Sequence, residues 1–275
     1  IEYVESHGGV EAVVAAMGRS PPPKMESDVA QLWGCVFLST VANTPARRLR
    51  VAQKDGVTAV VAAMRAAPLH AGIAQHGCRA LWNIAAGPPE GRAVFRRNDV
   101  RCVVEAMRVH AASAEVAEEG CGALHQIACE ADLRGHAAKA GAVRACCAAL
   151  RKHAGVVRVC EDACGALAEL LESCADQTGW RTQPALDELS DVAKRVTAIL
   201  LKLRHGSSGA SAADLDCAAA ACCFLLRLIS PYVRDHVSDH VNDDSRRTSD
   251  GSAEQADGAG PALLHSVVAS GIVVA

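Results

Sequence analysis

The amino-acid sequence predicts an all-α protein built of stacked helical repeats. One motif recurs four times: a small residue, then cysteine, then leucine three residues later and an aliphatic residue three beyond that. The repeating cysteines are 43 residues apart at each step: Cys35, Cys78, Cys121 and Cys164. A fixed period of this length is the signature of a repeat architecture, because each unit must bury its apolar face against its neighbours.

The composition favours closely packed helices over a β-sandwich or barrel. Half of the 275 residues are apolar but only 3% are aromatic, so the core must consist mainly of Ala, Val, Leu and Cys. A sandwich or barrel would instead show alternating β-branched and aromatic residues. The net charge of −3 gives no overall attraction to nucleic acid or to an anionic membrane. No apolar run is long enough for a membrane span.

The 13 cysteines do not resemble a disulfide framework. Five of them, including Cys222, recur at one helical core position, where cysteine acts as a small hydrophobe. The pair Cys146–Cys147 is adjacent, and the sequence contains no CxxC. We therefore expect reduced thiols and a cytoplasmic or nuclear localisation.

Each repeat is expected to contain three helices. The second helix carries a glycine or aspartate followed by Val-x-x-Val-Val-x-Ala-Met, as in 56–64 and 99–107. The third and longest helix has one apolar stripe and one polar side, over about 72–86, 115–129 and 157–171. A shorter helix precedes the second one, and proline-containing turns separate the repeats because proline cannot continue a helix.

These signals predict one solenoid across the whole chain. Its units span about 1–44, 45–87, 88–130, 131–173 and 174–230, and the fifth carries inserted residues. Residues 234–260 are polar and poor in large apolar side chains, which predicts a disordered loop. Residues 261–275 resume the pattern as the start of a sixth unit. Because the pattern begins and ends within a unit, we expect a fragment of a longer array.

The period, the three helices, the glycine before the second helix and a third helix such as 77–85 resemble armadillo repeats. The resemblance covers nearly the whole chain apart from the insertions. It implies a right-handed α-solenoid whose third helices line a concave groove that binds extended peptides. HEAT repeats are the structural alternative, but they have two helices and lack the glycine break.

The third helices supply the candidate partner-binding residues. Side chains three before, one after and five after each repeating cysteine lie four apart, so they share one exposed strip. These candidates are Gln75, Arg79, Asn83, Glu118, Gly122, Gln126, Glu161, Gly165, Glu169 and Arg227. In the nuclear-import adaptors of the armadillo family the strip carries a ladder of Trp and Asn. Only Asn83 matches that ladder, with Gln126 as a conservative substitute, which argues against a transport adaptor.

The same strip suggests the chemistry of a partner. The amides of Asn83 and Gln126 offer a donor and an acceptor to an extended backbone. Gly122 and Gly165 would let that backbone come close. Several acids follow along the strip, which predicts a partner segment with basic residues if they are more than a solvated face: Glu118, Glu119, Glu161, Asp162 and Glu169.

No motif predicts catalysis, a cofactor or a metal. The sequence lacks the phosphate-binding and nucleophile motifs GxxxxGK[ST], GxGxxG and GxSxG. His236 and His240 have the spacing of helical metal ligands, but they lie in the polar loop without the glutamate of HExxH. Cys121 and His125 share one helix face, yet Cys121 belongs to the buried stripe, where a thiol is no nucleophile.

The predicted function is a non-catalytic scaffold that binds a protein or an extended peptide along the groove. One alternative is the regulatory armadillo array of a larger enzyme, such as a kinase or a ubiquitin ligase. The other is a nuclear transport adaptor. The sequence predicts no nucleic-acid partner.

Overall fold

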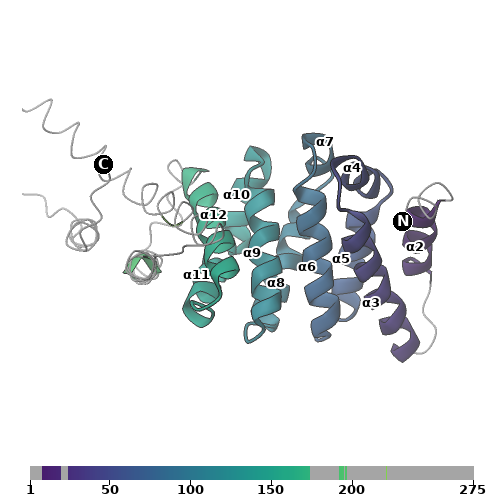
Figure 1. Ribbon diagram of the computed structural model, residues 1–275, viewed down its shortest axis with the longest axis horizontal. Helices are drawn as coiled ribbons and strands as arrows, with labels where there is room; N and C mark the ends of the chain where they lie inside the picture. Colours follow the sequence, from purple (N-terminus) through teal and green to yellow (C-terminus); the bar gives the residue numbers. More distant parts are fainter. Residues whose placement is uncertain (1–7, 20–23, 174–191, 195, 197–220, 222–275) are drawn as a thin grey trace, which may run out of the picture.

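The computed structural model describes residues 8–19 and 24–173, together with 192–194, 196 and 221. Every regular element in this part of the chain is an α-helix, as the sequence predicts, and no strand is present there. The helices stand side by side in a row from α2 to α12 (Figure 1). The predicted fifth unit lies largely outside the described residues, and the loop at 234–260 and the sixth unit lie wholly outside them.

The repeats from residue 45 onward have a first, a second and a third helix, and the repeat before them is described from its second helix on. The first helices are α4 (Pro45–Gln53), α7 (Pro89–Arg92) and α10 (Ala131–Ala140). The second helices are α2 (Gly9–Met17), α5 (Gly56–Ala66), α8 (Arg97–Val109) and α11 (Ala142–Lys152). The third helices are α3 (Lys24–Val41), α6 (Ala71–Ala85), α9 (Ala114–Ala128) and α12 (Val157–Ser173). Adjacent third helices pack against one another, which gives the stack a continuous layer.

The repeating cysteines lie at the centre of this stack. Cys35, Cys78, Cys121 and Cys164 are all buried, and the nine cysteines of the described part are free thiols. Burial raises the pKa of Cys35 to about 12 and that of Cys102 to about 11. These thiols are therefore neutral and act as small apolar side chains.

A methionine–glycine contact joins the second helix of a repeat to its third helix. A Cβ atom on Gly77 would lie 2.6 Å from Met64 Cγ, and one on Gly120 would lie 2.5 Å from Met107 Cγ. A larger residue at either glycine would separate the two helices. The glycines before Cys78 and Cys121 are thus explained by helix packing.

Arginines of the first helices cap the ends of the third helices. Arg48 Nη1 donates to the Ala86 carbonyl at 2.9 Å, and Arg134 Nε donates to the Ala128 carbonyl at 2.8 Å. The last carbonyls of a helix lack intrahelical partners and carry the negative end of its dipole. A guanidinium at this place donates hydrogen bonds to these carbonyls and also places a positive charge at the negative end of the dipole.

Candidate protein-interaction surface

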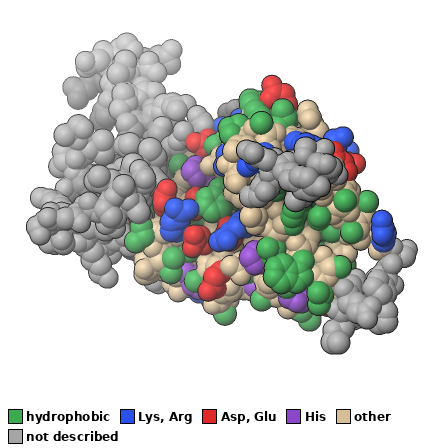
Figure 2. All heavy atoms as spheres, turned by 45° about the vertical axis from the view of Figure 1, so that its right-hand side comes forward, with side chains coloured by type: hydrophobic (Ala, Val, Ile, Leu, Met, Phe, Trp, Pro, Cys, Tyr) green, Lys and Arg blue, Asp and Glu red, His purple; other side chains and the backbone are tan. Residues whose placement is uncertain are grey.

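The structure brings nine of the ten predicted groove residues onto three adjacent third helices, and Arg227 lies outside the described residues. Helix α6 carries Gln75, Arg79 and Asn83; α9 carries Glu118, Gly122 and Gln126; and α12 carries Glu161, Gly165 and Glu169. On the face drawn in Figure 2, acidic, basic and histidine side chains lie interspersed among apolar ones. The surface is therefore polar and mixed in charge.

The two glycines of the predicted strip are buried rather than open. A Cβ atom on Gly122 would lie 2.7 Å from Trp82 Cδ2, and one on Gly165 would lie 2.5 Å from His125 Cε1. Trp82 and His125 occupy the same position, four residues after the repeating cysteine. The sequence predicted that a partner's backbone would approach these glycines closely. In the structure a side-chain ring of the preceding repeat occupies that place instead.

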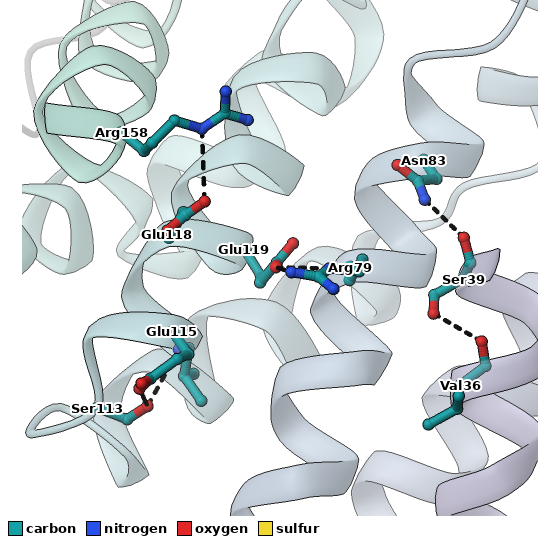
Figure 3. Close-up of polar contacts among 10 residues, drawn as sticks. Val36, Ser39, Arg79, Asn83, Ser113, Glu115, Glu118, Glu119 and Arg158 are labelled. Carbon is teal, nitrogen blue, oxygen red and sulfur yellow. Dashed lines mark hydrogen bonds and ion pairs between the residues drawn. The ribbon is translucent and has the colours of Figure 1, made fainter. Parts of the chain in front are cut away.

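Trp82 also belongs to a cluster that spans three repeats. The guanidinium carbon of Arg158 on α12 lies 5.6 Å from the centre of the Trp82 ring, which is a cation–π contact. Arg158 Nε also lies 3.4 Å from Glu118 Oε1 on α9 (Figure 3). One arginine thus connects α12 to both α9 and α6.

A second ion pair joins α6 to α9. Arg79 Nε donates to Glu119 Oε1 at 2.6 Å (Figure 3). The side chain of Glu119 is only 1% exposed, whereas that of Arg79 is 45% exposed. Burial raises the pKa of Glu119, and the hydrogen bond from Arg79 opposes that rise. Among the described residues Glu119 Oε2, which is buried, has no hydrogen-bond partner, so the carboxylate depends chiefly on Arg79 for its compensation.

Most acids of the predicted strip have a basic neighbour in the protein itself. Besides the pairs of Glu118 and Glu119, Asp162 Oδ1 lies 3.8 Å from His125 Nδ1. Glu169 Oε2 lies 3.4 Å from Arg134 Nη2. Arginines of the molecule therefore offset the charges of Glu118, Glu119 and Glu169, whereas His125 offsets that of Asp162 only when it is protonated.

Asn83 uses part of its amide to join neighbouring repeats. Its Nδ2 donates to the Ser39 carbonyl at 2.7 Å, near the end of α3 (Figure 3). This bond satisfies a carbonyl that the helix end leaves without a partner. No further hydrogen bond of the Asn83 amide is found within the described part of the chain, which leaves one N–H donor and the Oδ1 acceptor.

Sequence analysis missed the residues that pair across repeats: Ser39, Trp82, His125, Arg134 and Arg158. A signal for some of these contacts exists, because Arg79–Glu119, Trp82–Gly122 and His125–Gly165 are each separated by 40 residues. This spacing is three residues shorter than the repeat. Aligning the units at this offset would place each ring opposite a glycine.

The described residues hold no group of three His, Cys, Asp or Glu side chains arranged as metal ligands. His236 and His240 lie outside the described residues. Cys121 is buried, and a hydrogen bond with Cys146 together with burial raises its pKa well above the usual value. None of the helices that the structure describes has the length and apolarity that a bilayer crossing requires.

Two solved structures share the architecture, and each is described as an engineered protein of the Northeast Structural Genomics Consortium. The first is 17% identical with a TM-score of 0.59, over 95% of this chain and 96% of that chain. The second is 18% identical with a TM-score of 0.61, over 98% of this chain and 59% of that chain. No protein-family model and no curated protein matches the sequence. At these identities the similarity concerns the fold alone, and the chain is an all-α helical-repeat protein.

Proposed function

We propose that this protein is a non-catalytic scaffold of the armadillo type, which binds an extended segment of a partner protein along its third helices. The observation that carries the proposal is a row of half-buried amide side chains on adjacent helices: Gln75 and Asn83 on α6 and Gln126 on α9. The armadillo resemblance of the sequence points to the same layer of helices.

Amide side chains suit recognition of an extended backbone because each offers both a donor and an acceptor. Gln75, Asn83 and Gln126 are half-buried, so packing already restricts them and binding costs less side-chain entropy. Gly122 and Gly165 contribute to this surface indirectly. Because they have no side chain, the rings of Trp82 and His125 can pack between the helices.

The ion pairs favour backbone-led recognition over the basic segment that the sequence suggested. A basic segment would have to displace Arg158 from Glu118 and the largely buried Arg134 from Glu169, and exchanging one ion pair for another gains little. The affinity of a partner should therefore fall only weakly as salt increases.

Selection of random cysteine-free peptides on the purified chain tests this function. The affinities of selected peptides are then measured for the wild type and for Gln75→Ala/Gln126→Ala. We expect the double variant to bind about tenfold or more weakly, because two backbone-binding amides are lost.

The matched control is Gln53→Ala, which removes an exposed amide at the end of α4. Its affinities should stay within about twofold of the wild type. Selection of no peptide, or equal binding by the double variant, would show that the third helices are not the binding surface.

A further inference from the structure

Helix α3 differs from the later third helices in the chemistry of its strip. At the places six before, three before and one after its repeating cysteine it carries Val29, Leu32 and Val36. The same places of α6, α9 and α12 hold charged, amide or glycine residues: Gly72, Gln75 and Arg79; Glu115, Glu118 and Gly122; Arg158, Glu161 and Gly165. Of the four third helices, α3 alone therefore presents an apolar strip.

The later repeats show which way these places face. The side chain of Arg158, which corresponds to Val29, is 52% exposed, and that of Arg79, which corresponds to Val36, is 45% exposed. The place two before the cysteine differs, because there Glu119 is covered by the preceding third helix and is 1% exposed. Val29 and Val36 thus lie at places that stay accessible even where another repeat packs alongside.

The apolar strip of α3 is only partly covered by the protein itself. Val29 is 53% exposed, and it is one of the few large apolar side chains of the described residues with such exposure. Leu32 and Val36 are half-buried, so the packing of α3 already restricts them. An apolar side chain that covers this strip would release water from both surfaces.

The apolar strip directly adjoins the amide row of α6. Leu32 Cδ1 lies 3.1 Å from the position that a Cβ atom on Gly72 would take, near the start of α6. Further along, the Ser39 hydroxyl donates to the Val36 carbonyl at 2.8 Å, and Asn83 of α6 donates to the Ser39 carbonyl (Figure 3). The two helices thus form one surface, which changes from apolar on α3 to amide on α6.

We propose that α3 binds a bulky aliphatic or aromatic side chain of the same partner segment whose backbone the amides hold, an inference that rests on the proposed function. Neighbouring helix axes lie about 8–10 Å apart, and an extended chain advances about 3.3 Å per residue. About three residues therefore lead from the Gln75 amide to Leu32, its counterpart on α3. The partner segment has its apolar residue at that separation.

A charged or strongly polar residue does not fit this place. Contact with Val29 and Val36 would remove its hydration, and the side chains of the strip offer no hydrogen-bonding group in exchange. An apolar residue instead gains from the area that it buries. The amides hold any extended backbone, whereas the apolar strip selects among segments by one side chain.

The probes are the cysteine-free peptides selected on the purified chain, with affinities measured by fluorescence anisotropy. We expect the selected sequences to share one leucine, isoleucine, phenylalanine or tryptophan. Replacing it with serine should weaken binding by about tenfold or more. Moving it by one position should weaken binding similarly, because successive side chains of an extended segment point to opposite faces.

The protein variant is Val29→Thr/Val36→Thr, which keeps the β-branched shape of both side chains but replaces one methyl group of each with a hydroxyl. It should weaken peptides that carry the apolar residue by about fivefold or more, and it should hardly affect their serine-substituted forms. Circular dichroism checks that the variant is folded. The substitutions in the peptide decide the question if it is not.

The matched control is Val104→Thr/Val143→Thr, which makes the same change at two half-buried valines of the second helices α8 and α11. Its affinities should stay within about twofold of the wild type. Selected peptides without a shared apolar residue, or equal binding by Val29→Thr/Val36→Thr and wild type, would overturn the inference.

This inference and the proposed function fail in different ways. Peptides that bind Val29→Thr/Val36→Thr like wild type but lose affinity for Gln75→Ala/Gln126→Ala would overturn the apolar site and support the amide row. The opposite pattern would support the apolar site and contradict the amide row, and selection of no peptide would overturn both.

Sedimentation equilibrium tests a second copy of the chain as the other occupant of α3. We expect the wild type and Val29→Thr/Val36→Thr to have the same molecular mass in solution. A wild-type dimer that this variant dissociates would overturn the inference, because α3 would then be covered by another copy.

Discussion

Glu119 is the least exposed acidic side chain in the described part of the protein, and its compensation comes from a neighbouring repeat. Arg79 supplies that compensation while keeping 45% of its own side chain exposed. A buried carboxylate without a partner is costly, and Glu119 Oε2 already lacks a hydrogen bond from any residue that the structure describes. At the scale of single residues, this pair therefore does more to connect repeats than a surface ion pair would.

Arg79→Ala should destabilise the protein by about 1–3 kcal/mol at neutral pH, because it leaves Glu119 buried and unpaired. Burial holds the pKa of Glu119 above its usual value in the folded state, so the folded state keeps the proton more firmly than the unfolded one. The contribution of this group to stability is therefore largest below the unfolded pKa and is lost as pH rises through the folded pKa.

The loss caused by Arg79→Ala should accordingly be smaller at about pH 5 than at about pH 8, as urea unfolding curves would show. The double variant Arg79→Ala/Glu119→Gln has no carboxylate at this place, so it should lose that pH dependence. An Arg79→Ala variant whose destabilisation is the same at both pH values would contradict this account.

At the scale of elements, two contacts set the distance between third helices. Trp82 lies against Gly122 and His125 against Gly165, so each pair of neighbouring helices meets where one side chain is absent. A larger side chain in place of the glycine or of the ring would displace a whole helix, because protein interiors are closely packed.

Gly122→Ala should lower the free energy of unfolding by about 1–3 kcal/mol, since its methyl group would overlap the indole ring. Gly155→Ala is the matched control, because no atom of the described residues lies within 4 Å of the position of its new Cβ. Chemical denaturation measures both variants. A Gly122→Ala protein as stable as Gly155→Ala would show that Trp82 can move aside freely.

The arginine caps give a second prediction for the elements. Arg134 caps the Ala128 carbonyl and lies 3.4 Å from Glu169, and its side chain is 14% exposed. Arg134→Ala should cost about 1–2 kcal/mol in thermal or urea unfolding. Lys139→Ala removes an exposed charge from the same helix and should change stability by less than about 0.5 kcal/mol. Equal losses would mean that the cap contributes nothing specific.

The elements also show how far the sequence can be interpreted. The third helices were predicted at 72–86 and 115–129, and they occur at Ala71–Ala85 and Ala114–Ala128. For the first helix of the third unit the sequence indicates only a short helix before the second one, and α7 spans just Pro89–Arg92. The chain there turns before α8, which begins at Arg97 with Asp99 accepting a hydrogen bond from the Arg96 N–H at 2.9 Å. Long periodic helices are thus easier to predict than short connecting ones.

The candidate surface was predictable only in part, for a geometric reason. Spacing along one helix places Gln75, Arg79 and Asn83 on a common strip, because i and i+4 share a face. The partners of these residues come from other helices, and their choice depends on how far neighbouring helices are displaced along their axes. That displacement is a property of packing, so the 40-residue offset that pairs Arg79 with Glu119 is present in the sequence but can be recognised only once the packing is known.

At the scale of the whole molecule, stability should vary along the stack, because each repeat packs mainly against its neighbours. Helix α9 has ten buried residues, whereas α2 has two. Amide hydrogen exchange followed by mass spectrometry should therefore be slower in α9 than in α2. Uniform protection across both helices would instead indicate a single cooperative unit, in which local burial does not control opening.

The ring-on-glycine contacts also limit the order in which these repeats can follow one another. A copy of the repeat with Trp82, inserted directly after itself, would place Arg79 where the indole needs glycine. A copy of the repeat with His125 would instead place Gly122 beneath the imidazole, and the two would fit. The units of this array are therefore not interchangeable modules. Tandem duplication would preserve the packing for the repeat with His125 but not for the repeat with Trp82.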